Sequence, residues 1–425
     1  MEREFDILVW GVTGFTGKLL LEYFLKEYSS KTPFSYRVGI AGRNKTKCLA
    51  VLQELQQQYP YANDISIVIA DAENPASVDA MVQRTRVLCS LVGPYAIYGE
   101  SVLRACVEHA TDYCDLTGEV HFIRAMIDKY HDLAVQKQVK IVHACGFDSI
   151  PSDIGVLFAQ KMYKKKYGVY ASQIRMLTGK MRGQLSGGTF ASMINLFEEM
   201  ATDTTIRKHM IHPYALYPSG DDKRNVKYGD IPLEEREQLW MRWEKHTHRV
   251  SIPFIMAGVN TKVVRRSNRL QGDIYGSDFI YSEAMGFPRS MWFRALALNM
   301  GLGMGAVALS IPFLRRWIHK KLLFQSGEGP SVEEMNKGHF TVEFASCNPT
   351  VSTDWMFSTV SDNIDPGYRC TAKMMWESVL SLLSVREDAT SPYHSVYGVL
   401  TPNSAMGEVL LERLEKQGMR FAVLS

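Results

Sequence analysis

Short apolar runs alternate with amphipathic segments over the first 153 residues of the chain. The runs are short enough to be buried strands, whereas the segments between them carry apolar residues at helical spacing. Strands and helices that alternate in this way predict a doubly wound, parallel α/β sheet. The predicted strands span residues 7–10, 36–41, 65–70, 87–92, 113–116 and 139–144, and the predicted helices span residues 18–25, 49–59, 100–109 and 120–137.

Three glycines, three positions apart, separate the first strand from the first helix. The N-terminus of a helix offers unpaired N–H groups and a favourable dipole to a phosphate. A side chain at Gly11 or Gly14 would obstruct the turn or a pyrophosphate, and one at Gly17 would hold the helix off the strand. The spacing is not G-x-G-x-x-G, but its place between strand and helix favours a dinucleotide site over a structural turn. The turn residues predicted to bind the cofactor are Gly11, Thr13, Gly14, Phe15, Thr16 and Gly17.

The residues that follow the second and third strands bear on the choice of cofactor. At the end of the second strand, an acid binds the ribose of NAD, whereas an arginine accommodates the 2′-phosphate of NADP. Arg43 occupies this place, with Lys45 and Lys47 close behind it and no acid. NADP is therefore favoured over NAD, and the alternative is a solvated basic turn. Asp71, after the third strand, either accepts a hydrogen bond from adenine or helps to cap the next helix.

The loops after the fourth and sixth strands supply the catalytic candidates, because ligands bind beyond the carboxyl ends of the strands in such a sheet. We expect Gly93 and Pro94 to border the nicotinamide. Tyr95 and Tyr98, in the same loop, either donate a proton or pack in the core. Asp148 either binds the substrate or holds an interdomain hinge.

Several other kinds of chemistry lack a sequence signal. None of the 20 tyrosines has a lysine four residues on, which argues against a short-chain dehydrogenase mechanism, and no histidine stands beside an acid in a relay motif. The seven cysteines form no C-x-x-C pair and no zinc-like spacing, so we expect no metal site and reduced thiols on the cytosolic side. The net charge of +3 is too small to attract nucleic acid.

Glu119 either contacts the cofactor or caps a helix.

The regular alternation stops after Asp153. A chain of 425 residues exceeds the usual size of a single core, so a second domain is expected. Apolar runs at residues 174–178, 259–265 and 340–344 predict strands of a different sheet. Ser186 precedes a helical stretch at residues 190–200, which a hydroxyl would cap.

Residues 295–314 carry no charge over 20 positions, which is enough for a helix to cross a hydrocarbon core. A basic, Trp-containing stretch follows directly and ends at Lys321. Asn299, three glycines and Pro312 argue against a full span, so a hairpin or interfacial helix that enters one leaflet is favoured. The alternative is a helix buried at a domain or subunit interface.

Five motifs in this order resemble those of the saccharopine dehydrogenase-like oxidoreductases. The resemblance is strongest to a eukaryotic branch found on lipid droplets, which is similar to bacterial trans-acting enoyl reductases. The motifs are Gly11-x-x-Gly14-Phe15-Thr16-Gly17, Ala41-Gly42-Arg43, Val92-Gly93-Pro94-Tyr95, Asp115-x-x-Gly118-Glu119 and Gly146-Phe147-Asp148-Ser149-Ile150-Pro151-x-Asp153.

The resemblance implies a division of the chain into three parts. These are a Rossmann domain over residues 1–153, an inserted α+β domain over residues 154–363, and C-terminal helices over residues 364–425 that return to the Rossmann domain. The resemblance also places Ser186–Thr189 beside the active cleft, implies a homodimer, and locates the protein on the cytoplasmic side of lipid droplets or membranes.

Together these features predict an NADP-dependent oxidoreductase that transfers hydride to or from a hydrophobic, lipid-like substrate. Residues 295–321 would hold it on a membrane or lipid-droplet surface. Reduction of a carbon–carbon double bond and reduction of a carbonyl are both open. The alternative function is an inactive, nucleotide-binding scaffold on lipid droplets, because the sequence reveals no acid–base pair.

Overall fold

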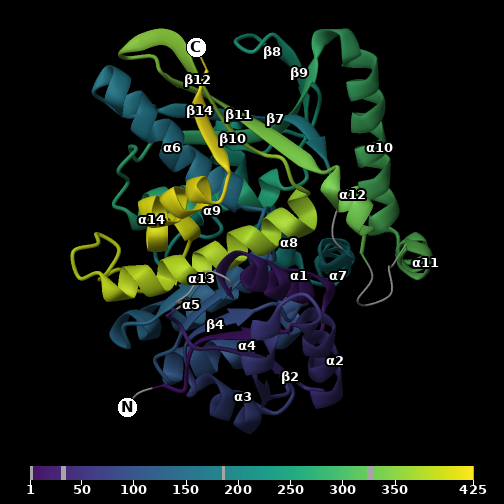
Figure 1. The fold of residues 1–425 in the computed structure, drawn as a ribbon. Coiled ribbons are helices and arrows are strands. Elements are labelled where there is room, and N and C mark those ends of the chain that lie inside the picture. The colour runs from purple at the N-terminus through teal and green to yellow at the C-terminus, as the bar shows by residue number, and fades with distance from the viewer. Residues whose placement is uncertain (1–2, 30–34, 184–186, 323–328, 425) are drawn as a thin grey trace.

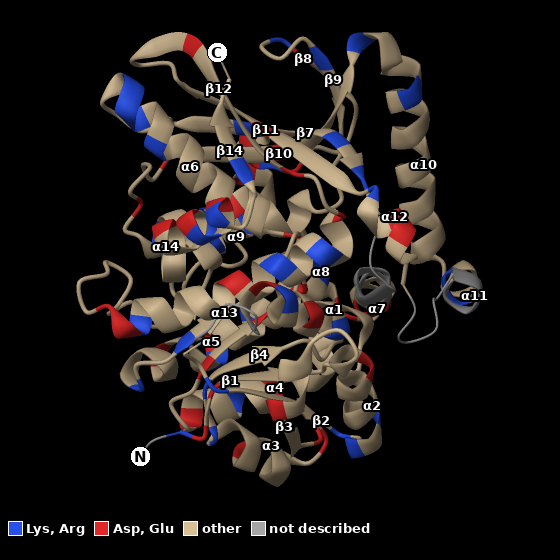
Figure 2. Cartoon of the chain, viewed as in Figure 1, with Lys and Arg blue, Asp and Glu red and all other residues tan. Residues whose placement is uncertain are grey.

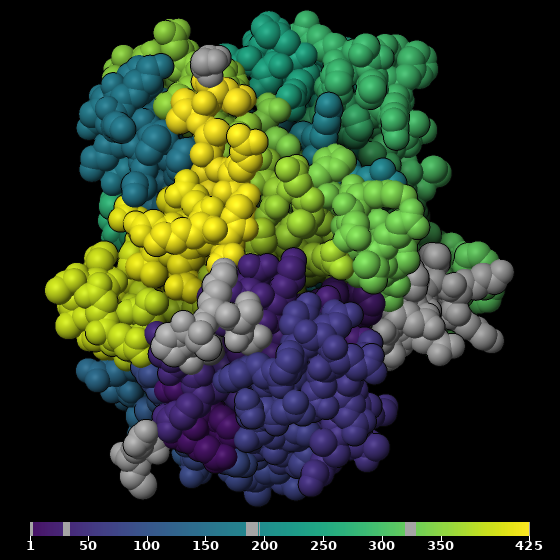
Figure 3. Space-filling model, in the orientation of Figure 1, coloured from purple at the N-terminus to yellow at the C-terminus, as the bar shows by residue number. Residues whose placement is uncertain are grey.

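The computed structural model describes residues 3–29, 35–183, 187–322 and 329–424 of the chain. These residues form two lobes, each built around one sheet, with C-terminal helices between them (Figure 1). The space-filling view shows the early residues gathered in one lobe and most of the later residues in the other (Figure 3).

In the described chain, the first sheet holds seven parallel strands in the order β13-β6-β5-β4-β1-β2-β3. Its crossover helices bury both faces, which explains the continuous apolar runs in the sequence. The predicted doubly wound sheet is confirmed. The strands are β1 (Phe5–Trp10), β2 (Val38–Gly42), β3 (Ser66–Ile69), β4 (Thr85–Ser90), β5 (Asp112–Asp115), β6 (Lys140–Val142) and β13 (Gly398–Leu400).

Helices on the two faces of the first sheet enclose two separate apolar cores. On one face, α1, α2 and α13 pack around Leu20, Leu52 and Trp376. On the other face, α3, α4 and α5 contribute side chains such as Val78 and Leu103. These helices are α1 (Phe15–Phe24), α2 (Lys45–Gln56), α3 (Pro75–Val82), α4 (Tyr95–Glu108), α5 (Val120–Gln136) and α13 (Thr371–Glu387).

The second sheet is mixed, and its described strands follow the order β14-β12-β11-β7-β10-β9-β8. β7 and β10 are parallel, and the other neighbours are antiparallel. The strands predicted at residues 174–178 and 340–344 lie in β7 and β11 and are confirmed. The strands are β7 (Gln173–Arg182), β8 (Arg242–Glu244), β9 (Arg249–Ile252), β10 (Ile280–Pro288), β11 (His339–Asn348), β12 (Ser352–Asp362) and β14 (Arg420–Val423).

The strand predicted at residues 259–265 is wrong, because these residues form part of α9 (Ala257–Leu270). Their β-branched valines favoured a strand. Val259 and Val263, however, are four residues apart, share one helix face and pack in the core that includes α5. Polar side chains on other faces are also buried and find partners elsewhere in the fold. The Asn260 amide, for example, donates to Glu283 across 3.0 Å.

The C-terminal residues connect the two lobes. α13 packs on α1, and β13 extends the first sheet beside β6. α14 packs on α6, whereas β14 pairs with β12 at an edge of the second sheet. The segment 364–425 thus serves both sheets, although we expected a return to the first alone. The remaining helices are α6 (Ile150–Tyr167), α7 (Gly187–Thr202), α8 (Thr204–Ile211), α10 (Trp292–Ser310), α11 (Pro312–Leu322), α12 (Val332–Asn336) and α14 (Pro402–Lys416).

The uncharged segment 295–314 forms most of α10 and the start of α11. Among the described helices, one stretch, Arg289–Ser310, is long and apolar enough to cross a membrane. Only 17% of its most apolar window is buried in the protein, so the segment is not a core helix within one copy of the chain. On its inner side, Ala295 packs with Val250 and Ile252 of β9.

Candidate cofactor and active site

The glycine turn joins β1 to α1, and Gly14 is the N-cap residue of that helix. Gly11 has a φ of 100°, and a Cβ atom there would lie 3.0 Å from the backbone carbon of Leu91. A Cβ atom on Gly17 would lie 2.3 Å from the Gly11 carbonyl oxygen. α1 can therefore approach β1 only because Gly17 has no side chain, which is the steric reason expected for a cofactor turn.

The glycine turn meets the loop that follows β4, at the point where the strand order reverses between β1 and β4. Ligands bind at such a switch point in open α/β sheets. Thr13 and Gly14 are exposed there, and in the described chain neither Thr13 nor Thr16 uses its hydroxyl in a hydrogen bond. The turn and the free N–H groups at the start of α1 fit a pyrophosphate.

Phe15 plays a different part from its neighbours in the turn. Its ring lies edge-on to Tyr368, with the ring centroids 4.8 Å apart, and fills the space that a Cβ atom on Gly329 would need. Its side chain therefore fixes the turn against the C-terminal part of the chain. What Phe15 can offer to a phosphate is its backbone N–H.

Arg43 directly follows β2, and Lys45 and Lys47 lie in the first turn of α2. All three side chains are exposed, and within the described residues none of them has a carboxylate or carbonyl partner. Asn44 caps α2 by accepting a hydrogen bond from the Lys47 N–H across 3.0 Å. Unpaired cations at the end of β2 fit the 2′-phosphate of NADP.

Asp71 shapes the loop that follows β3. Its Oδ1 atom accepts from the Glu73 N–H across 3.1 Å, and its own N–H donates to the Ser77 hydroxyl across 3.0 Å. Asn74 is the N-cap residue of α3 and accepts from the Ser77 N–H. Asp71 thus braces the turn before the helix, and its Oδ2 atom has no partner among the described residues.

The two predicted tyrosines both lie in the first turn of α4, but their surroundings differ. The Tyr95 hydroxyl is buried, donates to the Ser90 carbonyl across 3.1 Å and accepts from the Leu116 N–H across 3.3 Å. Burial raises the pKa of Tyr95 well above its ordinary value. This geometry favours the packing role for Tyr95. Tyr98 is half-buried, and in the described chain its hydroxyl makes no hydrogen bond. Gly93 is exposed and Pro94 is the N-cap residue of α4.

Glu119 closes the same loop from the other side. Its carboxylate accepts from the Tyr95 N–H across 3.1 Å and from the Ala96 N–H across 2.7 Å. An anion at the N-terminus of a helix is stabilised by the helix dipole and by these N–H groups. The structure thus supports the capping alternative for Glu119.

Sequence reasoning missed a buried histidine–aspartate pair. Asp115 ends β5, His143 follows β6, and the His143 Nδ1 atom lies 2.8 Å from the Asp115 Oδ2 atom. The Tyr113 hydroxyl donates to the same carboxylate across 2.9 Å, and so does the Thr117 N–H across 3.0 Å. The pair lies 28 residues apart in the chain, so no local motif reveals it. The available signal was a polar residue at the carboxyl end of each of two neighbouring strands.

Asp148, in the loop after β6, is half-buried, and its carboxylate has no protein partner in the described chain. Its Oδ2 atom would lie 3.7 Å from a Cβ atom on Gly118, beside Val259 at the start of α9. Burial raises the pKa of Asp148 to about 6. The next residue, rather than Asp148, bonds to α9, since the Ser149 hydroxyl donates to Asn260 across 3.0 Å. This arrangement favours the substrate-binding alternative over the hinge.

Two other carboxyl groups, those of Asp153 and Glu283, are more deeply buried than that of Asp148. Glu283 accepts from the Tyr281 hydroxyl across 2.7 Å as well as from Asn260. Asp153 accepts from the Ser267 hydroxyl across 2.6 Å. Burial raises the pKa of each of these two acids to about 7. They hold α6, α9 and β10 together and are not open to a ligand. Ser186 lies outside the described residues, so its predicted roles stay predictions.

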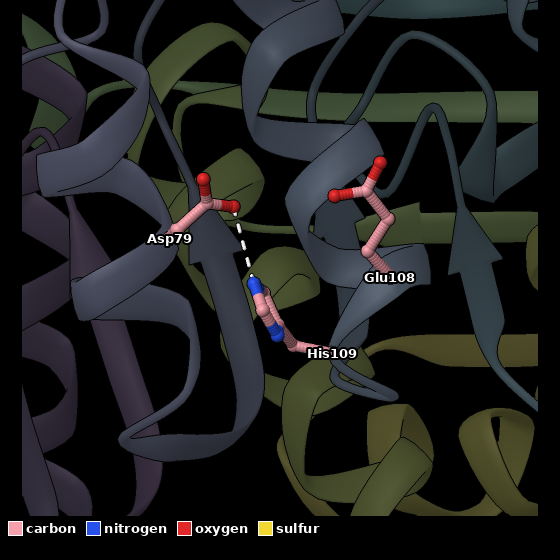
Figure 4. A group of neighbouring side chains, drawn as sticks. All are labelled: Asp79, Glu108 and His109. Carbon is pink, nitrogen blue, oxygen red and sulfur yellow. Dashed lines mark hydrogen bonds and ion pairs between the residues drawn. The ribbon is translucent and has the colours of Figure 1, made fainter.

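One group of described residues, Asp79, Glu108 and His109, has ligand atoms close enough together for a metal ion (Figure 4). The His109 Nε2 atom lies 3.2 Å from Asp79 (Figure 4). Arg104 already pairs with both carboxylates, however, so a cation of the protein compensates their charge. The group also lies at the opposite end of α4 from Tyr95. We therefore interpret it as a surface ion network.

A Rossmann sheet with a glycine turn at its switch point and unpaired cations after β2 defines the class of NADP-binding oxidoreductases. Residues 7–142 match the family model of the saccharopine dehydrogenase NADP binding domain. The chain is 33% identical to trans-acting enoyl reductases of Mycobacterium tuberculosis and Mycobacterium leprae, over 98% of this chain and 97% of each relative. It therefore belongs to the saccharopine dehydrogenase-like oxidoreductases, and its cofactor is NADP.

The fold agrees with this assignment. Apo saccharopine dehydrogenase (L-Glu forming) from Saccharomyces cerevisiae superposes with a TM-score of 0.50 at 12% identity, over 99% of both chains. At that identity the match concerns the fold alone. The relatives named as reductases support an active oxidoreductase and do not favour the scaffold alternative.

Proposed function

We propose that the chain transfers a hydride between NADP and a hydrophobic, lipid-like substrate at the carboxyl edge of the first sheet. The observation that carries this proposal is the carboxyl group of Asp148. It lies beyond β6, at the same edge as the glycine turn, and no described residue pairs with it. A half-buried acid that titrates near neutral pH, at the edge where the cofactor binds, is suited to proton transfer.

The residues that would hold NADP are those placed around the switch point. The turn from Gly11 to Gly17 would cradle the pyrophosphate, and Arg43 would pair with the 2′-phosphate. Asp71 would accept from the adenine amino group, and Gly93 with Pro94 would border the nicotinamide ring. The bound cofactor would supply the hydride.

Asp148 would supply the proton that accompanies the hydride. In the protonated form it can donate to the carbon or oxygen atom that becomes electron-rich, and water can restore its proton after release of the product. Tyr98 is the second candidate donor because its hydroxyl has no partner in the described chain. The relatives are named for enoyl reduction, which favours a carbon–carbon double bond conjugated to a carbonyl over a simple ketone.

Cofactor titration and turnover test this proposal together. We expect Arg43→Gln to weaken NADPH binding about tenfold or more and to leave NADH binding nearly unchanged, because one charge-assisted contact is lost. The exposed Lys416 at the end of α14 provides the control, Lys416→Gln. NADPH oxidation is then followed with a long-chain trans-2-enoyl thioester and with a ketone of equal length. Binding of NADPH without turnover on either substrate would contradict the proposed reaction.

We also propose that residues 295–321 hold the protein on the cytoplasmic surface of a membrane or lipid droplet. In support, α10 and α11 form the right-hand edge of the molecule (Figure 3), and large apolar side chains on them are open to solvent. Met304 is 66% exposed and Phe313 is 75% exposed. So much contiguous apolar surface is unusual for a soluble monomer and marks an interaction site.

Substitution of the exposed apolar residues tests the surface proposal without disturbing the buried side of α10. We expect Val307→Ser combined with Met304→Ser and Phe313→Ser to release the protein into the cytosol, with no change in NADPH affinity. Ile97→Ser, an equally apolar and exposed position on α4, is the control. A triple variant that still sediments with droplets would contradict this part of the proposal. A homodimer stays an expectation from the family resemblance.

A further inference from the structure

A second exposed aromatic surface lies beside the N-terminal end of α10, outside the segment discussed above. Trp240 precedes β8 and is 57% exposed, and Trp243 within β8 is 54% exposed. The guanidinium of Arg289, just before α10, lies 5.8 Å from the centroid of the Trp243 ring. The start of α10 adds Trp292 and Phe293, whose rings are in tilted contact with their centroids 4.0 Å apart. We call these residues, together with Arg294, the aromatic corner.

The charge of the aromatic corner is positive only. In the described chain, Arg289 and Arg294 are exposed and have no carboxylate partner. The nearest acid in β8, Glu244, is bound to Arg175 across 2.7 Å. The sequence contains no Asp or Glu between Glu283 and Glu328, and α10 carries blue but no red in Figure 2.

The packing of α10 fixes which of its sides a lipid could reach. Ala295 and Asn299 are buried against the second lobe, whereas Met300, Met304 and Val307 are exposed along one side at helical spacing. The strands on either side of the segment, β10 and β11, belong to the same sheet. A transmembrane orientation would strip α10 from β9, so only a helix lying flat on a lipid surface keeps the fold intact.

We infer that the aromatic corner binds the headgroups of anionic phospholipids and, with α11 at the other end, holds α10 flat on the lipid surface. This inference rests on the proposed lipid contact of residues 295–321. Tryptophan prefers the membrane interface, where its ring meets acyl chains and its N–H meets water. Unpaired arginines next to such rings are attracted to anionic headgroups. A protein partner would need a surface that is both acidic and strongly apolar to bind in the same way.

Vesicle sedimentation tests the inference on the full-length protein. The vesicles are phosphatidylcholine alone or phosphatidylcholine with phosphatidylserine. We expect the wild-type protein to bind the second kind more tightly. Arg289→Gln with Arg294→Gln should lower that affinity about fivefold per arginine and remove the preference for phosphatidylserine. Trp240→Ser with Trp243→Ser should weaken binding to both kinds of vesicle.

Matched controls come from the opposite edge of the same sheet. Arg420 and Val423 lie on β14, whereas the aromatic corner lies at β8, and Arg420→Gln with Val423→Ser should leave vesicle binding unchanged. Retained NADPH affinity shows that each variant is folded.

Three outcomes would overturn the inference, and they differ from failure of the proposed function. If the corner variants bind vesicles like the β14 control, while the α10 triple variant does not bind, the corner alone is wrong. If the wild-type protein binds no vesicle, the lipid contact of residues 295–321 fails too, whereas the oxidoreductase assignment stands on NADPH binding. If the corner variants abolish a dimer formed without lipid, a second copy of the chain covers this surface.

Discussion

Gly17 is the residue on which the shape of the cofactor turn depends most directly. Adding one methyl group there would place a carbon atom 2.3 Å from the Gly11 carbonyl oxygen and 2.8 Å from the Val12 Cα atom. Both neighbours belong to the backbone and cannot rotate away. The glycine is thus required by packing as well as by the ligand.

We expect Gly17→Ala to lower the free energy of unfolding by about 1–3 kcal/mol, as overpacking does, and to weaken NADPH binding at least about tenfold. Chemical denaturation and calorimetric titration measure the two effects. Gly301→Ala is the control, because a Cβ atom on Gly301 of α10 meets no atom within 4 Å. Equal behaviour of the two variants would show that the turn is adaptable.

The carboxyl group of Asp148 is half-buried and has no partner among the described residues. The pH dependence of turnover should therefore report its raised pKa. Its pKa of about 6 means that the protonated acid is lost as the pH rises through 6. We expect turnover of an enoyl substrate to fall above this pH, and Asp148→Asn to be slow at every pH. If turnover by Asp148→Asn still falls above pH 6 as in the wild type, the decrease belongs to another titrating group.

The same substitution should affect stability in the opposite sense. The folded-state pKa of Asp148 lies above the unfolded value of about 4, so the folded protein is penalised once the carboxylate forms. The penalty is absent below pH 4 and complete above pH 6. We expect Asp148→Asn to raise the free energy of unfolding by up to about 3 kcal/mol at pH 7.5, but not at pH 4. A destabilised variant at pH 7.5 would indicate a hidden partner.

α9 shows what a local sequence pattern could not supply. The helix is almost entirely buried, although it carries Lys262, Arg265 and Arg266. Arg265 and Arg266 donate hydrogen bonds to carbonyl groups of other elements, and Lys262 donates to the Gly258 carbonyl within the helix. Arg265, for instance, donates to the Tyr281 carbonyl across 2.9 Å. Neither a helical stripe nor a charge pattern predicts such a helix, and the β-branched valines were the stronger local signal.

We expect Lys262→Met to stabilise the protein, because burial lowers the pKa of the Lys262 amine to about 8 from an unfolded value of about 10.4. The charged amine costs the folded state most below pH 8, and the cost disappears as the pH rises toward 10. The variant should exceed the wild type by about 2–3 kcal/mol at pH 7, with a smaller difference at pH 10. Denaturant titrations at both pH values test this, with Lys245→Met, at an exposed lysine, as the control. A constant difference would contradict it.

Features that depend on consecutive residues could be predicted from the sequence, whereas features that depend on contacts between distant residues could not. Six of the seven strands of the first sheet and the glycine turn depend on consecutive residues, so they were predicted, whereas β13, which joins the sheet from the distant C-terminal part of the chain, was not. Residues that meet only in the fold were not, as His143 and Asp115 show. The alternatives for Tyr95 and Glu119 depended on which way one loop turns, and only the contacts among Tyr95, Leu116 and Glu119 distinguish them.

The whole molecule is one connected unit rather than two independent lobes. The C-terminal residues place β13 in the first sheet and β14 in the second, and α13 packs against α1 beside the glycine turn. Neither sheet is complete without this segment. The two lobes should therefore unfold together.

We expect calorimetry to show a single unfolding transition, and NADPH at 100 times its dissociation constant to shift the entire transition by about 2.7 kcal/mol. NADH at the same concentration should shift it less. Two resolved transitions, of which NADPH moves only one, would show that the lobes are energetically independent.

The late arrival of β13 also shapes how the protein is made. β6 is left as an open edge of the first sheet from the moment residue 142 leaves the ribosome until residue 398 follows, about 250 residues later. At bacterial or eukaryotic rates of translation, the nascent chain carries that unpaired edge for roughly 10 to 50 s. A chaperone that binds extended apolar segments could bind the exposed β6 edge during this time. Synonymous codons that slow translation between residues 142 and 398 should therefore make folding depend more strongly on such a chaperone.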